Sequence, residues 1–243
     1  MSFDESESVE RTDLIMPTGS LNVVLNFADP QFLVNSEGAL EKLPDILITG
    51  QLDKVWKLQY GANLNQIGLI LKPVGFFKLF QVPGALFAGT FIDGGEAPWN
   101  LTGLYSSLEQ TRDFDTSFRI VENYLEEVTK SRDSLELLNK MISSIESAKG
   151  NMTMEELASL YNKSISAIER YFKKMIGMTP KAYANIVKFR TAMKEMDESK
   201  GMLDYYYDQS HFIKSCKKYT GKTPSELMKS NQEISLSYML EQG

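Results

Sequence analysis

A segment near the end of the sequence repeats itself without gaps at an offset of 44 residues, and this repeat constrains the fold most strongly. The first copy, residues 166–180, reads SAIERYFKKMIGMTP, and the second, residues 210–224, reads SHFIKSCKKYTGKTP. Each copy predicts a helix with a basic end, a glycine stop and a further helix that begins at Thr-Pro. Two copies are too few for a solenoid and are typical of a tandem pair of modules.

The residues around the first copy predict a helix, a tight turn and a second helix. Thr153 and Glu156 have the spacing of a capping box, which begins a short helix. Asn162 is suited to a left-handed turn, and Ser164 is suited to cap the helix 164–176. That helix has an apolar side at Ile168 and a polar, basic outer side, which is the arrangement of a major-groove reader.

The Thr-Pro pair at residues 179–180 predicts a long helix that joins the two modules. Proline at the first helical position loses no hydrogen bond, because its missing N–H would have had no partner there. An apolar stripe follows at Tyr183, Ile186, Val187, Met193 and Met196.

The first half of the chain has the signals of strands. Short runs rich in β-branched and aromatic residues, separated by Pro, Gly, Asn or Asp, occupy residues 21–27, 46–51, 55–60 and 67–71. This spacing predicts a small antiparallel barrel or sandwich rather than βαβ units. Residues 75–80 predict a short helix, followed by a turn at residues 82–84. The chain is therefore expected to be an α+β protein of two domains.

Residues 114–149 predict two amphipathic helices, the second ending at Lys149-Gly150-Asn151. We place the domain boundary there, which gives a β-rich domain over residues 1–149 and an all-α domain over residues 150–243. The apolar stripes of these helices favour core packing against the strands over a dimer-forming seam, because a coiled-coil seam persists for three or more heptads. They are Phe118, Val121, Leu125 and Val128, then Leu135, Leu138, Ile142 and Ile145.

Charge is distributed unevenly along the chain. Residues 1–149 hold 12 basic and 21 acidic side chains, whereas residues 150–243 hold 14 and 11. An acidic body with a mildly basic end fits a regulator with a separate DNA-reading part. No signal peptide or membrane-spanning run is recognised, and the single cysteine fits a reducing compartment, so we expect a cytoplasmic protein without membrane association.

These motifs resemble the AraC/XylS family of transcription activators. The resemblance rests on Ala158, Asn162, Ser164, Ile168, Arg170, Phe172-Lys173, Gly177 and Thr179-Pro180, and on residues 207–212, Lys217-Lys218 and 221–224. It covers about residues 150–230. Residues 17–20, 50–51 and 72–75 also look like a β-rich, cupin-like N-terminal domain of some members. The resemblance implies two helix-turn-helix units joined by a linker helix that contact successive major grooves of double-stranded DNA. It also implies an N-terminal domain that senses a ligand or mediates dimerisation.

Carried onto matching positions, the resemblance implies DNA-binding residues on two recognition helices, 164–176 and 209–220. Base-facing candidates are Ser166, Glu169 and Arg170 in the first and Ser210, Ile213 and Lys214 in the second. Phosphate-facing candidates are Lys173, Lys174, Lys217 and Lys218, and Ser164 completes the set at the helix start. Arg170 is suited to a bidentate pair with guanine, and Glu169 either accepts from cytosine or pairs with Lys173.

The second unit departs from the family pattern. Its first helix should occupy residues 197–205, which offer little apolar surface, and Cys216 stands where the first copy has Phe172, which predicts a gap. Three hypotheses follow: a DNA binder that uses both units, a regulator that reads DNA mainly through residues 153–177 and dimerises, or a degenerate member that acts by protein contacts. RNA polymerase, a small-molecule effector and a second copy of the chain are open as partners.

Catalysis, metal binding and cofactor binding are not expected. The single histidine, His211, and Cys216 lie about 140° apart around one predicted helix, so they cannot form a nucleophile–base pair. No cluster has the spacing of metal ligands or of a phosphate-binding loop. Aromatic side chains of the first half either line an effector pocket or, as we favour, form core: Trp56, Phe76, Phe77, Phe80, Phe87, Phe91 and Trp99.

Overall fold

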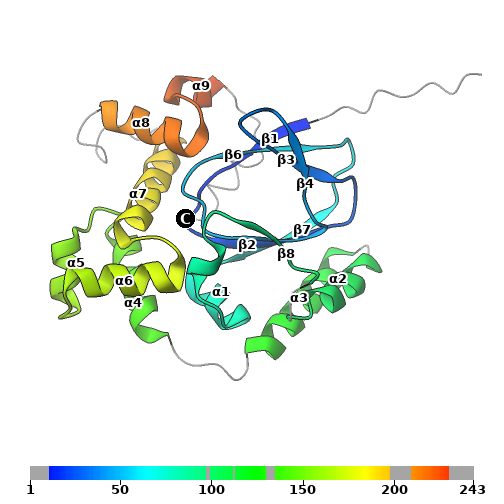
Figure 1. Cartoon of the computed structure of the whole chain (residues 1–243), viewed down its shortest axis with the longest axis horizontal. Helices are drawn as coiled ribbons and strands as arrows, with labels where there is room; N and C mark the ends of the chain where they lie inside the picture. The colour runs from blue at the N-terminus through cyan, green and yellow to red at the C-terminus, as the bar shows by residue number, and fades with distance from the viewer. Residues whose placement is uncertain (1–10, 97–98, 112, 130–134, 198–208, 230–243) are drawn as a thin grey trace, which may run out of the picture.

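The computed structural model describes residues 11–96, 99–111, 113–129, 135–197 and 209–229, in which all strands lie before residue 94 and most helices follow them (Figure 1). The strands are β1 (Arg11–Ile15), β2 (Leu21–Asn26), β3 (Gln31–Val34), β4 (Leu40–Lys42), β5 (Ile46–Thr49), β6 (Trp56–Tyr60), β7 (Gln66–Leu71) and β8 (Phe91–Asp93). The helices are α1 (Pro73–Phe80), the 3-10 helix η1 (Gly84–Phe87), α2 (Leu101–Glu109), α3 (Phe114–Thr129), α4 (Glu136–Ser147), α5 (Met154–Leu160), α6 (Ile165–Ile176), α7 (Pro180–Asp197), α8 (Gln209–Thr220) and α9 (Pro224–Lys229).

The strands form two antiparallel sheets, with orders β1-β6-β3-β4 and β7-β2-β5-β8. The predicted α+β class with a β-rich first part is confirmed. The barrel alternative is wrong, because the sheets are open and no described strand pairs across from one sheet to the other. The four predicted strands are β2, β5, β6 and β7, whereas β1, β3, β4 and β8 were not predicted.

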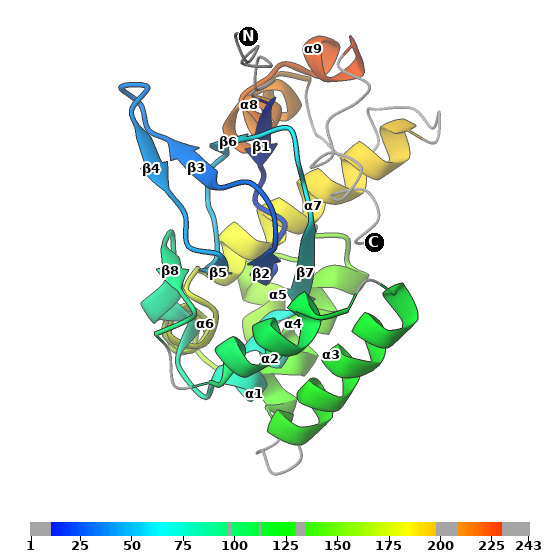
Figure 2. The same cartoon turned by 90° about the vertical axis from the view of Figure 1, so that its right-hand side faces the viewer.

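The second sheet has two different faces because successive side chains of a strand point to opposite sides. On β2, Leu21, Val23 and Leu25 belong to a buried cluster together with α1, η1 and α2. Asn22 and Val24 point the other way, toward the first sheet. Helices α1, α2 and α3 therefore cover one face only, as the two views show (Figures 1 and 2).

The two amphipathic helices predicted over residues 114–149 are α3 and α4, but they pack in different places. On α3, Val121, Leu125 and Val128 are half-buried against the strand cluster, which confirms core packing for these three residues, whereas Phe118 of the same predicted stripe is 53% exposed. On α4, Leu138 and Ile145 lie in one cluster with the C-terminal helices. The expectation that this second stripe packs against the strands is thus wrong, because an apolar stripe specifies burial but not the partner. The domain boundary at residue 150 stays a prediction.

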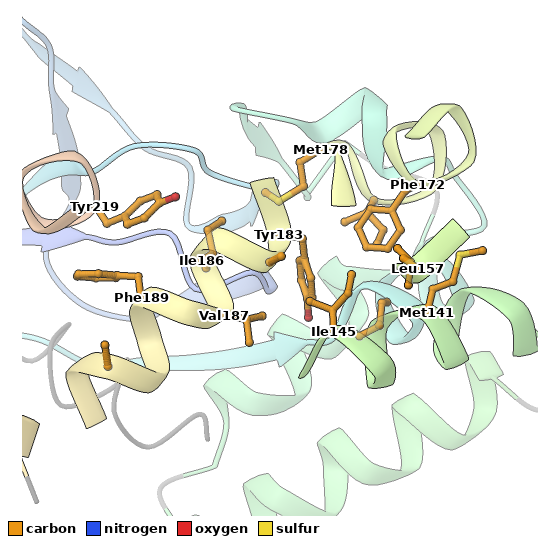
Figure 3. Close-up of a cluster of buried hydrophobic side chains, with 14 of the residues drawn as sticks. Met141, Ile145, Leu157, Phe172, Met178, Tyr183, Ile186, Val187, Phe189 and Tyr219 are labelled. Carbon is orange, nitrogen blue, oxygen red and sulfur yellow. The ribbon is translucent and has the colours of Figure 1, made fainter. Parts of the chain in front are cut away.

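The C-terminal helices share a core that is arranged along α7. Figure 3 shows Phe172, Leu157 and Ile145 near Tyr183, and Tyr219 beside Phe189 farther along the same helix. The rings of Phe172 and Tyr183 meet edge-on with centroids 5.8 Å apart, and those of Phe189 and Tyr219 lie 5.1 Å apart. Helix α7 thus supports both copies of the repeat, as predicted for the linker helix.

The strand half contacts α7 through residues 16–20, all of which are buried. Arg190 on α7 donates from Nη1 to the carbonyl oxygen of Thr18 at 3.0 Å, and Gln51 donates from Nε2 to that of Gly19 at 2.8 Å. Gly19 lies against Tyr183, since an added Cβ would lie 3.0 Å from the ring. Residues 17–20 and 50–51, two of the segments that carry the N-terminal resemblance, therefore meet beside the linker helix.

Candidate nucleic-acid interface and cavity

Short-range interactions determine where the two helices of the first helix-turn-helix unit begin and how the chain turns between them. Thr153 and Glu156 form both hydrogen bonds of a capping box, at 2.8 and 3.1 Å. Asn162 adopts a left-handed conformation with φ of 49°. The Ser164 hydroxyl accepts from the backbone N–H of Ala167 at 3.2 Å, which caps α6. These predictions are confirmed, and Ser164 has a structural role whether or not it contacts DNA.

Helix α6 separates a buried side from an exposed polar side. Its four buried residues anchor it in the C-terminal core: Ile168, Phe172, Met175 and Ile176. The opposite side exposes Ser166, Arg170, Lys173 and Lys174, with Glu169 half-buried beside them. The structure thus gathers every predicted DNA-binding residue of the first helix on one surface, which we call the α6 face.

The ionic groups of the α6 face are not paired with each other. Glu169 and Lys173 form no ion pair in the described structure, so the pairing alternative at these two positions is not realised. Arg170 likewise has no carboxylate partner among the described residues. A guanidinium without an intramolecular partner keeps its donors available for an acceptor on a ligand.

The buried positions of α6 are also buried in α8. The buried residues of α6 correspond, at the 44-residue offset, to the buried residues Phe212, Cys216, Tyr219 and Thr220. The exposed side of α8 carries Ser210, Lys214, Lys217 and Lys218, with Ile213 half-buried. This α8 face holds all predicted residues of the second recognition helix. Both helices end at a left-handed glycine, Gly177 with φ of 94° and Gly221 with φ of 73°.

Cys216 is fully buried, and its neighbours differ in size from those of Phe172. Phe212 and Tyr219 stand where the first copy has the smaller Ile168 and Met175, and both rings pack against Phe189. The prediction of a gap was based on position 216 alone. It did not take into account the larger side chains at the neighbouring positions 212 and 219. The first helix of the second unit, expected at residues 197–205, lies outside the described residues except for Asp197, the last residue of α7.

Burial makes the Cys216 thiol unreactive. The reactivity of this thiol therefore measures whether α8 is packed on α7. Removal from water raises the pKa of Cys216 to about 12, because burial disfavours the thiolate. At pH 8 its thiolate fraction is about a thousandfold smaller than that of an ordinary cysteine. We expect Ellman's reagent to label the native protein at least about 100-fold more slowly than the urea-unfolded protein. Equal rates would show that α8 is not packed on α7.

The strand half contacts the last turn of α6. Gly84 of η1 lies so close that an added Cβ would be 2.6 Å from the carbonyl oxygen of Met175. The same close approach is seen from Gly177, whose added Cβ would lie 2.7 Å from the carbonyl oxygen of Gly84. The contact holds the end of α6 and leaves Ser166, Arg170, Lys173 and Lys174 exposed.

A cavity of about 210 Å³ lies between the two sheets. Apolar side chains from both sheets supply most of its wall, among them Leu14, Val24, Leu47, Leu58 and Ile70. Thr18 and Met16, from the segment held by α7, form part of the same wall. The cavity is larger than the roughly 150 Å³ cavity that admits benzene, so it has room for a small organic molecule.

The predicted aromatic residues do not line this cavity. Phe76, Phe80 and Phe87 are buried in the core beneath the second sheet, where the ring of Trp99 meets that of Phe80 edge-on. The preference for core over pocket at these positions is confirmed. The signal that was missed lies in polar residues on inward positions of otherwise apolar strands, namely Asn22 and Thr49.

The two residues considered for nucleophilic catalysis do not meet. Cys216 is buried, whereas His211 is exposed. Among the described residues, no three His, Cys, Asp or Glu side chains are grouped as metal ligands would be. Within the same described ranges, no helix combines the length and the apolar character that crossing a bilayer requires.

Residues 157–230 match the family described as "Helix-turn-helix domain". No curated protein sequence matches the chain. Among solved structures, an apo variant of ToxT from Vibrio cholerae strain SCE256 is similar, with 10% sequence identity, coverage of 90% of this chain and 93% of that chain, and a TM-score of 0.52. Unsaturated fatty acid bound wild-type ToxT from the same strain has 10% identity, coverage of 94% and 97%, and a TM-score of 0.47. At this identity the likeness to the apo variant shows a shared fold.

Proposed function

We propose that this chain regulates transcription by reading a specific DNA sequence. Residues 157–230 match a helix-turn-helix domain, and the repeat within them resembles the AraC/XylS family of DNA-binding transcription regulators. In this proposal α6 enters the major groove and α8 enters a neighbouring one. Ser166, Glu169 and Arg170, with Ser210, Ile213 and Lys214, face base edges. Lys173, Lys174, Lys217 and Lys218 lie near phosphates, and a chromosomal target implies action in the bacterial cytoplasm.

The observation that carries the proposal is the exposed α6 face on a helix whose opposite side is anchored. Phe172 and Ile176 are fully buried, so α6 has a fixed position relative to the core. Its hydroxyl, carboxylate and guanidinium groups are those that hydrogen-bond to base edges, and lysines flank them. The α8 face has the same arrangement of basic side chains as the α6 face. This favours DNA binding over a function through protein contacts alone, because a protein-binding surface does not require a second basic helix face.

The salt dependence of duplex binding tests the phosphate contacts. Each neutralised phosphate contributes about −0.9 to the slope of log affinity against log salt concentration. We expect the Lys173→Ala/Lys174→Ala double variant to have a slope shallower than wild type by about 2. Fluorescence anisotropy measures this slope. A duplex is selected from a random library and titrated at salt concentrations between about 50 and 200 mM.

The matched control removes two exposed lysines from the strand half. Lys42→Ala/Lys57→Ala changes the net charge equally but lies on the first sheet. Its slope should equal that of wild type. Equal slopes for all three proteins, or a flat response of wild type, would contradict the placement of Lys173 and Lys174 near phosphates.

We further propose that the cavity between the sheets is the site of a small-molecule effector. Its wall includes Thr18, whose carbonyl oxygen binds Arg190 of α7, so a ligand there contacts the segment that holds the linker helix. A homodimer remains part of the proposal, with the stacked and exposed Phe114 and Phe118 as apolar surface on α3. Contact with RNA polymerase stays a prediction.

A further inference from the structure

The wall of the cavity between the sheets has a polar part with an unusual composition. Asn22 on β2 and its cross-strand partner Thr49 on β5 stand side by side in the second sheet. Gln31, which is buried, donates from Nε2 to Oε1 of Gln66 at 2.8 Å and so links the two sheets. Asp13 of β1 completes this part of the wall.

One hydrogen-bond acceptor of this wall has no partner. Oδ1 of Asn22 is buried and accepts no hydrogen bond from any described residue. A buried polar atom without a partner is costly, so a hydrogen bond donated by a ligand to the amide of Asn22 would be favourable. The wall therefore favours a ligand with a hydrogen-bond donor, which is either a hydroxyl O–H or an amide or amine N–H.

The charge of the wall excludes an anion. Among the described residues that line the cavity there is no lysine or arginine, and the one ionisable side chain is the acidic Asp13. A carboxylate or phosphate placed here would lose its water without gaining a cation from these residues. An anionic ligand is thus disfavoured.

From these observations we propose that the cavity binds a small, uncharged, mostly apolar molecule with at least one hydrogen-bond donor. Its volume of about 210 Å³ admits a ligand somewhat larger than benzene. This inference rests on the proposed effector site and names its ligand class. Long-chain fatty acids and small aromatic acids fall outside the class.

Benzamide and benzoate test the ligand class, because they have nearly the same shape but differ in charge and in donor groups. The full-length protein is titrated with each compound, and with oleate, while methyl NMR signals of the leucine, isoleucine and valine residues are recorded. Benzamide should bind saturably and should shift the signals of Val24 and Leu58. Benzoate should bind at least about tenfold more weakly, and oleate should bind no more tightly than benzamide.

Gly68 offers a way to close the cavity without disturbing its neighbours. It lines the cavity, and an added Cβ there would meet no atom within 4 Å. Gly68→Val should abolish benzamide binding, whereas Gly75→Ala on α1, also in open space, should leave it unchanged. Circular dichroism of the same samples shows whether Gly68→Val is folded, independently of DNA. Duplex binding is measured in parallel, and Gly68→Val should retain it.

The outcomes separate this inference from the proposed DNA-binding function. Benzamide binding that is lost in Gly68→Val supports the ligand class even if wild type binds no duplex. Tighter binding of benzoate or oleate, absence of benzamide binding, or unchanged binding by Gly68→Val would overturn the ligand class while leaving duplex binding to stand on its own result.

Discussion

Replacement of Phe172 by alanine is expected to lower the free energy of unfolding by about 3–5 kcal/mol and to abolish DNA binding at growth temperature. The ring is fully buried and meets Tyr183 edge-on with centroids 5.8 Å apart. It lies on the side of α6 opposite Arg170, so it holds the α6 face in place. Because a domain is stable by only about 5–15 kcal/mol, this loss removes a large part of the total.

Urea denaturation followed by circular dichroism measures this effect, with duplex binding assayed on the same preparation. Leu40→Ala is the control, because Leu40 is 50% exposed on β4 and its truncation should change the free energy of unfolding by less than about 0.5 kcal/mol. A Phe172→Ala variant as stable as Leu40→Ala would show that α6 is not anchored by the core described above.

Features of the C-terminal half that depend on local chemistry could be predicted from the sequence. The capping box of Thr153 and Glu156, the left-handed turn at Asn162 and the cap at Ser164 involve partners no more than a few residues apart. The 44-residue repeat predicted the second helix with a basic exposed side, since equal spacing places equivalent residues on equivalent faces of α6 and α8.

Features that depend on distant partners could not be predicted. The second apolar stripe, on α4, could have packed on either half, and only the fold assigns it to the C-terminal core. Strand β4 (Leu40–Lys42) was missed because its residues are exposed and lack an alternating pattern, and only its pairing with β3 defines it. The cavity depends on the stacking of two sheets, which brings Asp13 and Asn22 to the wall of one cavity without any local signal.

The aromatic residues of the first half are a second case in which the sequence alone could not predict the location of side chains. Their abundance raised two alternatives, pocket and core, and the choice between them required the location of α1. Phe76 and Phe80 follow a helical spacing and meet with centroids 4.5 Å apart beneath the second sheet. The polar residues that the sequence placed inside apolar strands were the better indicator of a ligand site, because burial of a polar group requires a partner.

Arg170→Ala is expected to weaken binding to the selected duplex by about 5- to 150-fold, the loss of about 1–3 kcal/mol that follows removal of a bidentate base contact. Binding to an unrelated duplex should change little, because one of several charges is removed and the phosphate-facing lysines remain. Arg119→Ala on α3 is the control, since it removes an exposed arginine outside the α6 face.

The ratio of affinities for the selected and the unrelated duplex, compared between wild type, Arg170→Ala and Arg119→Ala, is the most direct test of the claim that α6 reads base sequence. The account predicts that this ratio falls steeply in Arg170→Ala alone. An unchanged ratio in Arg170→Ala, in a protein that retains its circular dichroism spectrum, would contradict it.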